Sequence, residues 1–285
     1  MIIARLRGGL GNQMFQYALG RHLALKNGAP LLLDLTELES TKLRKYELGF
    51  FNIAAKTISD YQIGHFARWG RNLRLGLDSK RWAETKEQSK FFDPRVLELR
   101  GDVYLDGYWQ SEKYFNGIRD TIREDFTFKT EPDPSNEKML EQIRRSNSVC
   151  LHVRRGDYVA DQITNRFHGT CGLDYYREAA NSIKARVPDA QFFVFSDDLD
   201  WASANMNLDG RSTIVGVNGT DKGVDDMRLM SNCKHFIIAN SSFSWWGAWL
   251  SKNPGKIVCA PKRWFREADE GDIIPESWVR IEGDA

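Results

Sequence analysis

Two adjacent arginines and a glycine follow an apolar run at the centre of the chain. Residues 149–153, Val-Cys-Leu-His-Val, are typical of a buried strand. The planar guanidinium of arginine binds phosphate oxygens through two parallel hydrogen bonds, so Arg154 and Arg155 beside Gly156 indicate a site for a leaving diphosphate. The alternative is that both arginines are solvated or pair with Asp157. This stretch alone leaves the two interpretations equally open.

Polar clusters follow three of the strands predicted in the second half of the chain. Apolar runs alternate there with stretches of helical periodicity, which predicts a parallel, doubly wound sheet. Such sheets bind ligands beyond the carboxyl ends of their strands. We predict strands at residues 149–153, 191–195, 213–217, 235–239 and 256–259, and helices at 173–187, 199–206, 225–233 and 242–252. The clusters begin at Arg154, Ser196 and Asn240, which places all three on one edge of the sheet.

The last cluster leads from a strand into a helix through hydroxyl side chains. Hydroxyl groups and free backbone N–H groups at a helix N-terminus cradle phosphate. Ser241 or Ser242 also suits a simple N-cap, and the two roles are compatible. The candidate ligand-binding residues of this cluster are Asn240, Ser241, Ser242, Phe243 and Ser244.

The middle cluster is acidic and consists of Ser196, Asp197 and Asp198. A carboxylate accepts hydrogen bonds well from the N1–H and the exocyclic amine of guanine, so this cluster favours a base-reading role. The Asp-x-Asp pattern that begins at Asp198 also occurs at manganese sites, but it is short and common. Because two arginines can neutralise a diphosphate, the sequence requires no metal.

The N-terminus predicts a strand at residues 2–6, a glycine-rich turn, a helix at 14–26 and a second strand at 30–35. Gly9 and Gly11 fit a dinucleotide fingerprint, but Met14 stands where the third glycine belongs, which disfavours a nicotinamide cofactor. A tight turn lets a ligand approach Gly11, and Asn12 and Gln13 place amides at a helix N-terminus. Alternatively, Asn12 only caps the helix.

Aromatic residues and an amide end the next predicted strand, at residues 103–110. Tyr108, Trp109 and Gln110 suit a sugar-binding cleft, and packing against a neighbouring domain explains them equally well. Residues 37–100 are irregular, with a predicted helix at 59–69, and are interpreted as decoration of an α/β core. The prolines at residues 132 and 134 mark a linker at 131–136. We therefore predict two domains, residues 1–135 and 136–285.

The overall composition is that of an ordinary globular protein. The 285 residues carry a net charge of +1, which gives no reason to expect nucleic acid or an anionic membrane as a partner. The first residues are too few and too soon charged for a signal peptide or membrane anchor, so we expect a cytoplasmic protein without stable membrane insertion. The four cysteines lack metal-site spacing and suit reduced core positions. Walker A and nucleophile-elbow motifs are absent from the sequence.

Together, several motifs resemble the α1,2-fucosyltransferases of glycosyltransferase family 11. They span nearly the whole chain in the order that the family shows. The motifs are residues 7–18 (RGGLGNQMFQYA), 107–115 (GYWQSEKYF), 152–158 (HVRRGDY), 168–176 (HGTCGLDYY) and 240–247 (NSSFSWWG).

The resemblance implies a GT-B fold, with two Rossmann-like domains whose parallel sheets face a central cleft. It implies inverting, metal-independent transfer of fucose from GDP-β-L-fucose to the 2-hydroxyl of a terminal galactose. GDP-L-fucose is then a co-substrate and there is no cofactor. The expected acceptor is a β-galactoside such as lactose or an O-antigen repeat. The lack of an anchor favours a bacterial, cytoplasmic member that builds surface glycans.

The resemblance also implies roles for individual residues. Arg154 corresponds to an arginine that stabilises the departing β-phosphate, with Arg155 beside it. His152 and Asp198 correspond to residues that contact guanine. Residues 241–244, called the serine loop below, correspond to a phosphate-binding loop, and Asn12 corresponds to a residue near the reaction centre. The N-terminal domain is expected to bind the acceptor, and the C-terminal domain GDP-fucose.

The sequence departs from the family at the general base. Some relatives carry a glutamate shortly after the arginine motif, and this neighbourhood offers Asp161 instead. Asp161, Asp157 and His168 are the candidates in that order; Asp157 alternatively orients the arginines, and His168 is also a candidate acceptor contact. The competing functions are a non-catalytic carbohydrate-binding protein and a Rossmann oxidoreductase.

Overall fold

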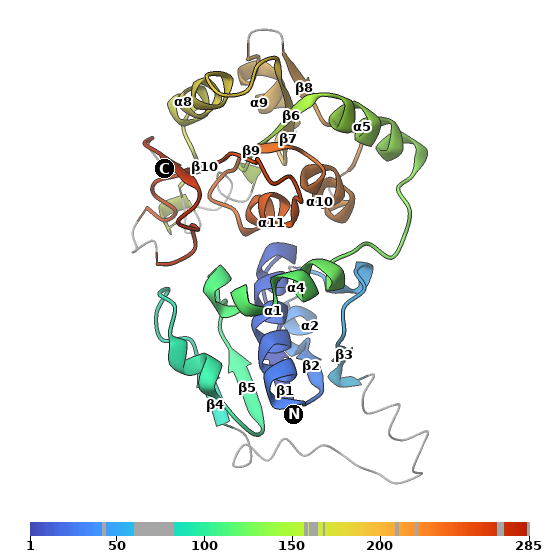
Figure 1. The fold of residues 1–285 in the computed structure, drawn as a ribbon, viewed down its shortest axis with the longest axis vertical. Helices are drawn as coiled ribbons and strands as arrows, with labels where there is room; N and C mark the ends of the chain where they lie inside the picture. Colours follow the sequence, from blue (N-terminus) through green and yellow to red (C-terminus); the bar gives the residue numbers. More distant parts are fainter. Residues whose placement is uncertain are drawn as a thin grey trace. The chain divides into compact units, whose positions relative to one another are not determined.

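The computed structural model divides the chain into two compact units (Figure 1). The first contains residues 1–129 and 271–273, and the second contains residues 130–270 and 274–285. The predicted boundary, between residues 135 and 136, lies a few residues beyond the division between the units. The structure describes residues 1–41, 44–59, 83–156, 159, 165–167, 169–208, 211–219, 222–266 and 271–283.

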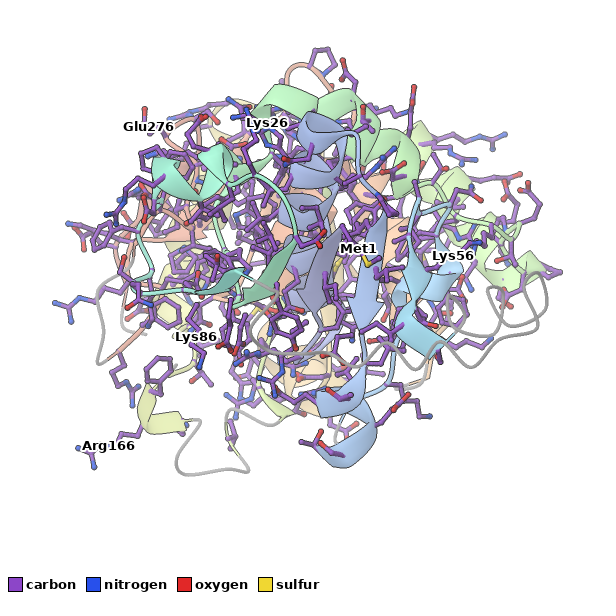
Figure 2. The ribbon with its side chains drawn as sticks, turned by 90° about the horizontal axis from the view of Figure 1, so that it is seen from below. Met1, Lys26, Lys56, Lys86, Arg166 and Glu276 are labelled. Carbon is purple, nitrogen blue, oxygen red and sulfur yellow. The ribbon has the colours of Figure 1, made fainter. Side chains whose placement is uncertain are left out.

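The first unit has a parallel sheet in the order β3-β2-β1-β5-β4. In Figure 2, Lys56 on β3 and Lys86 on β4 lie on opposite sides of Met1, which precedes the central β1. The strands are β1 (Ile2–Arg5), β2 (Leu31–Asp34), β3 (Lys56–Thr57), β4 (Ala83–Lys86) and β5 (Val103–Asp106). The helices are α1 (Leu10–Asn27), α2 (Thr36–Thr41) and α4 (Arg119–Asp125), with 3₁₀ turns at Leu48–Phe50, Pro94–Glu98, Glu112–Tyr114 and Asn116–Ile118.

The second unit has an all-parallel sheet in the order β11-β10-β9-β6-β7-β8. Its strands are β6 (Asn147–Val153), β7 (Ala190–Ser196), β8 (Ser212–Ile214), β9 (His235–Ile237), β10 (Val258–Pro261) and β11 (Val279–Ile281). Its helices are α5 (Pro134–Arg145), α8 (Leu173–Lys184), α9 (Leu199–Asn205), α10 (Gly223–Ser231) and α11 (Ser242–Leu250). The predicted alternation of strands and helices is confirmed.

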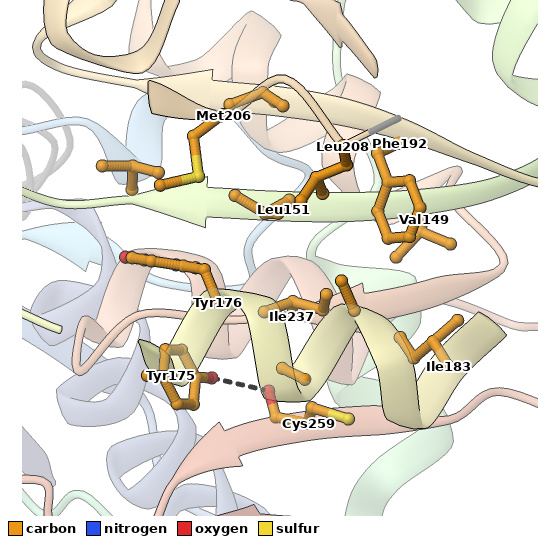
Figure 3. Packing of buried hydrophobic residues seen from close by; sticks show 14 of the residues in the cluster. Val149, Leu151, Tyr175, Tyr176, Ile183, Phe192, Met206, Leu208, Ile237 and Cys259 are labelled. Carbon is orange, nitrogen blue, oxygen red and sulfur yellow. Dashed lines mark hydrogen bonds between the residues drawn. The ribbon is translucent and has the colours of Figure 1, made fainter. Parts of the chain in front are cut away.

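Helix α8 covers one face of the second sheet, where alternate residues of β6 point. Val149 and Leu151 pack there with Tyr176 and Ile183 of α8 (Figure 3). Tyr175 on the same helix donates its hydroxyl hydrogen to the carbonyl of Ile238 at 2.5 Å, and its oxygen lies 3.2 Å from the carbonyl of Cys259. Because strand side chains alternate, His152, which follows Leu151, belongs to the other face of the sheet.

Two predictions about local structure were wrong. Residues 134–136 were assigned to a linker, but they form the first turn of α5. Asp133 caps that helix by accepting from the backbone N–H of Asn136 at 2.9 Å, and Pro134 fits because the first helical N–H needs no partner. The region read as decoration also supplies β3 and β4, which extend the first sheet. Most of the predicted helix at 59–69 lies outside the described residues.

All four cysteines are buried and form no disulfide, in agreement with their predicted place in the core. Among the helices that the structure describes, none is both long enough and apolar enough to cross a bilayer.

Candidate active site

The predicted clusters meet where the strand order of the second sheet reverses. From β6, the chain continues outward through β7 and β8 on one side, and then through β9, β10 and β11 on the other. Ligands of doubly wound folds bind in the crevice beyond such a switch point. Arg154 directly follows β6, and Asn240 lies at the same sheet edge after β9. The topology therefore places the arginines and the serine loop beside one another.

Asp197, at the end of the neighbouring β7, orients the first arginine. Its Oδ2 lies 2.9 Å from Nη1 of Arg154, and its Oδ1 accepts from the backbone N–H of Arg155 at 2.8 Å. A Cβ atom on Gly156 would lie 2.8 Å from Oδ2 of Asp197, so a larger residue at that position would push this carboxylate away. The side chains of Arg154 and Asp197 are 22% and 23% exposed, which leaves the guanidinium within reach of a ligand.

The second arginine lies between an acid and an aromatic ring. Its Nε lies 3.3 Å from Oδ2 of Asp198, and its guanidinium carbon lies 4.2 Å from the ring centroid of Trp201. The other carboxylate oxygen of Asp198 accepts from the backbone N–H of Trp201 at 3.1 Å and caps α9. Asp198 thus fixes Arg155, and any guanine contact would have to use its remaining lone pairs. The alternative pairing of the arginines with Asp157 falls outside the described residues.

His152 lies behind the arginines and is almost fully buried, at 4% exposure. Burial lowers the pKa of His152 to about 4. The attraction to the Asp197 carboxylate opposes this shift without cancelling it, and the repulsion from Arg154 adds a smaller lowering. The imidazole is therefore neutral at physiological pH. Its Nδ1 has no hydrogen-bond partner among the described residues, and its ring lies 5.9 Å from that of Phe243. A buried polar atom without a partner is a candidate ligand contact.

Some residues of the serine loop and the preceding Asn240 hold the local structure together, and others are accessible to a ligand. The amide of Asn240 donates to the carbonyls of Gly169 and Trp264, each at 3.3 Å, so this residue ties neighbouring loops together. The hydroxyl of Ser244 is buried and donates to the carbonyl of Ser241 at 3.3 Å. Ser241 precedes α11, but its side chain makes no capping hydrogen bond. Ser242 and Phe243 are partly exposed and remain the predicted donor contacts.

The first sheet has its own switch point, between β1 and β5. Asn12, in the first turn of α1, accepts from the amide of Gln110 at 2.8 Å, which joins the segments that follow these two strands. The alternative role of Asn12 as a helix cap is excluded, because α1 is preceded by Gly9 without a side-chain cap.

Gln13 is fully buried in the same helix. Its amide donates to the carbonyls of Gly8 and Lys45 at 3.0 and 2.8 Å, and its oxygen accepts from the N–H of Glu47. These bonds leave no exposed atom for a nucleotide, so we do not carry Gln13 into the proposed site. Gly11 is also buried.

The candidates for the general base, Asp161, Asp157 and His168, lie outside the described residues. No group of three or more potential metal-ligating side chains occurs in the described ranges. Sequence reasoning missed the orienting roles of Asp197 and Asp198 and the stacking of Trp201. The adjacent acids were a visible signal, but they were considered only as base-reading groups or as part of a manganese site.

Two Rossmann-like units with parallel sheets define the GT-B class of glycosyltransferases. NodZ of Bradyrhizobium, an α-1,6-fucosyltransferase whose crystals were soaked with GDP-fucose, superposes with a TM-score of 0.53 and 18% identity. The alignment covers 89% of this chain and 96% of NodZ. At this identity the likeness shows the fold alone.

Residues 81–282 match the profile of Glycosyl transferase family 11, and the chain belongs to this family. The chain is 39% identical to an α-1,2-colitosyltransferase of Escherichia coli, with 99% of both chains aligned. It is 31% identical to the O-antigen biosynthesis glycosyltransferase WbnK of Escherichia coli over 97% of this chain and 99% of that protein. Galactoside α-(1,2)-fucosyltransferase 1 of Rattus norvegicus is 27% identical over 86% of this chain and 62% of its own length.

Proposed function

We propose that this protein is an inverting, metal-independent galactoside α1,2-fucosyltransferase. It transfers L-fucose from GDP-β-L-fucose to the 2-hydroxyl of a terminal β-galactose, as in lactose or an O-antigen repeat. The second unit binds the donor and the first binds the acceptor. The observation that carries this proposal is the pair of arginines held by Asp197 and Asp198 at the switch point of the second sheet.

The arginines suit a diphosphate because their orientation is set before a ligand arrives. Asp197 and Asp198 hold the two guanidinium groups, and Trp201 supports the second from one face. A preorganised cation stabilises developing charge without reorganising during the reaction. The neutral, buried His152 is unsuited to balancing phosphate charge and suits a hydrogen bond with the uncharged guanine base.

The proposed reaction forms one bond and breaks one. The galactose O2 attacks C1 of fucose while the bond from C1 to the β-phosphate oxygen breaks, and GDP leaves with the electron pair. The configuration at C1 inverts from β to α, and the proton of the attacking hydroxyl passes to a general base. Asp161 is the first candidate for this base. Arg154 neutralises the charge that grows on the departing β-phosphate.

Transfer of colitose is the second candidate function. The relative that is 39% identical is named an α-1,2-colitosyltransferase. Colitose is fucose without its 3-hydroxyl, so GDP-colitose and GDP-fucose present the same diphosphate and differ by one hydroxyl on the sugar. A site that hydrogen-bonds the 3-hydroxyl rejects the deoxy sugar strongly, whereas a site that is apolar there discriminates weakly.

The deciding experiment incubates the protein with lactose and either GDP-fucose or GDP-colitose. Initial rates and product mass identify the donor, and NMR of the product identifies the linkage. We expect the higher kcat/KM with GDP-fucose and an α1,2 linkage to galactose. A reversed preference establishes the colitosyl function, and no transfer from either donor leaves a carbohydrate-binding protein or an oxidoreductase.

A chelator tests the proposed independence from metal. We expect activity with GDP-fucose and lactose to be retained in excess EDTA, because the two arginines take the place of a cation at the diphosphate. Loss of activity in EDTA that Mn²⁺ or Mg²⁺ restores would contradict the proposal. We further propose that the protein acts in a bacterial cytoplasm on a surface-glycan precursor, as the name of its relative WbnK suggests.

A further inference from the structure

An aromatic ring is exposed at the switch point of the first sheet. Tyr108 lies two residues beyond the end of β5 and is 41% exposed, at the sheet edge where ligands of doubly wound folds bind. The guanidinium carbon of Arg7, after β1, lies 5.5 Å from its ring centroid. Gln110 continues from Tyr108 and donates to Asn12. The ring is therefore steadied from the segment that follows β1.

The backbone beside this ring is held in an unfavourable conformation. Trp109 has φ of +57°, in the left-handed region that a bulky L-residue rarely adopts. Its side chain is 2% exposed and meets the ring of Tyr114 edge to face at 5.6 Å. The backbone turn thus sends one aromatic ring into the core and leaves its neighbour outside. Trp109 offers no face to a sugar, although it was predicted as an acceptor contact together with Tyr108.

A single carboxylate fixes this turn. The two oxygens of Glu87 accept from the consecutive backbone N–H groups of Tyr108 and Trp109, at 2.7 and 2.8 Å. A Cβ atom on Gly107 would lie 2.4 Å from Cβ of Glu87, so the side chain packs directly against the backbone before the turn. Both carboxylate oxygens are engaged in orienting Tyr108, and Glu87 is partly buried.

We propose that Glu87 is a positioning residue of the acceptor subsite, and that it fixes Tyr108 as the surface on which the galactose ring stacks. The inference rests on the proposed transfer to a galactoside. The axial 4-hydroxyl of galactose leaves one face of the ring with C–H groups at C3, C4 and C5, and this face packs well on an aromatic ring. Gln110, two residues after Tyr108, and its hydrogen-bond partner Asn12 are the polar groups expected to meet the sugar hydroxyls.

The test compares Tyr108→Ala, Glu87→Gln and their double variant with Glu84→Gln as the matched control. Glu84 lies on β4 and is exposed, and it forms an ion pair with Lys86 of the same strand. Glutamine keeps the shape of Glu87 but offers an N–H group where one backbone N–H needs an acceptor. If Glu87→Gln does not fold, Gly107→Ala disturbs the same turn, because its Cβ atom would lie 2.4 Å from Cβ of Glu87 and 2.8 Å from the ring of Trp109.

With saturating donor, we expect Tyr108→Ala to raise the acceptor KM about ten-fold, equivalent to about 1.4 kcal/mol. Glu87→Gln should raise the acceptor KM about five-fold, while kcat and the Kd for GDP stay within two-fold of the wild-type values. In the Tyr108→Ala background, the same substitution should raise the acceptor KM by less than a further two-fold. If Glu87 had only a structural role, Glu87→Gln would lower thermal stability and would raise the acceptor KM by the same factor in the wild type and in Tyr108→Ala. That additivity, or an acceptor KM unchanged in Tyr108→Ala, would overturn the proposal.

A second readout separates this inference from the proposed function. Saturation-transfer NMR with methyl β-D-galactopyranoside, in the presence of GDP and without donor sugar, detects acceptor binding without catalysis. We expect a signal for the wild type and for Glu84→Gln and its loss in Tyr108→Ala. If the wild type transfers neither fucose nor colitose, the proposed function fails, and the NMR result still decides the subsite. An equal signal in Tyr108→Ala refutes the subsite even if transfer is observed.

Discussion

Replacing Arg154 with alanine tests the proposed chemistry at the leaving group. A unit charge at about 4 Å from the guanidinium gains about 4 kcal/mol at the effective dielectric constant of a protein surface. The side chain is 22% exposed and shares its charge with Asp197 at 2.9 Å, which reduces the gain. We therefore expect Arg154→Ala to raise the barrier by about 3 kcal/mol, a loss of at least a hundred-fold in kcat.

The assay measures initial rates with saturating lactose while the donor concentration is varied. Because Arg154 acts on charge that grows in the transition state, kcat should fall much more than the donor KM rises. Arg177→Ala is the control, since Arg177 is exposed on α8 and pairs with Asp174 on the same helix. The loop should keep its shape in Arg154→Ala because Asp197 still accepts from the N–H of Arg155. A rise in KM with unchanged kcat would refute the leaving-group role.

Three further predictions concern stability. Burial raises the pKa of Asp226 from 3.8 to about 6. Between these two pH values the folded state therefore binds more protons than the unfolded state. The free energy of unfolding should fall by at most about 3 kcal/mol as the pH rises through this window. Urea denaturation should show this fall in the wild type and lose it in Asp226→Asn, and equal pH slopes would contradict the assignment. Gly8→Ala should lower the free energy of unfolding by about 1–2 kcal/mol, because φ is +73° and a Cβ atom would lie 2.5 Å from Nδ2 of Asn12. Gly9→Ala is the control, since nothing lies within 4 Å of its Cβ position, and it should lower the free energy of unfolding clearly less. Tyr175→Phe should lower the free energy of unfolding, measured by thermal denaturation, by about 1–3 kcal/mol, because the carbonyl of Ile238 loses its buried hydrogen-bond donor. An unchanged Tm would show that this hydrogen bond contributes nothing to stability.

The fold was predictable where local signals agree with the tertiary structure. Residues 149–153 and 191–195 are apolar, and they form the buried central strands β6 and β7. Strand β4, with the sequence Ala-Glu-Thr-Lys, shows no apolar pattern, because it lies at the sheet edge with Glu84 and Lys86 in solvent, so it could not be recognised from the sequence. Pro134 breaks both periodicities as a sequence signal, yet it also fits the first turn of a helix.

The residues of the candidate site could be predicted from the sequence, but the individual role of each residue could not. Arg154 and Asp197 are recognisable as charged residues at strand ends, but their pairing depends on β6 and β7 being neighbours. The burial of Trp109 depends on Glu87, more than twenty residues earlier in the chain, and no local pattern indicates this contact. Gln13 looked accessible in a glycine-rich turn, whereas the helix directs its amide to the backbone of residues 45 and 47.

The most direct test of the central claim is a crystal structure with GDP bound. We expect the guanidinium of Arg154 to lie within hydrogen-bonding distance of the β-phosphate oxygens, with no metal ion between them. The pairing with Asp197 should be retained or only loosened. A β-phosphate bound through a divalent cation, or an Arg154 side chain directed away from the diphosphate, would contradict the account.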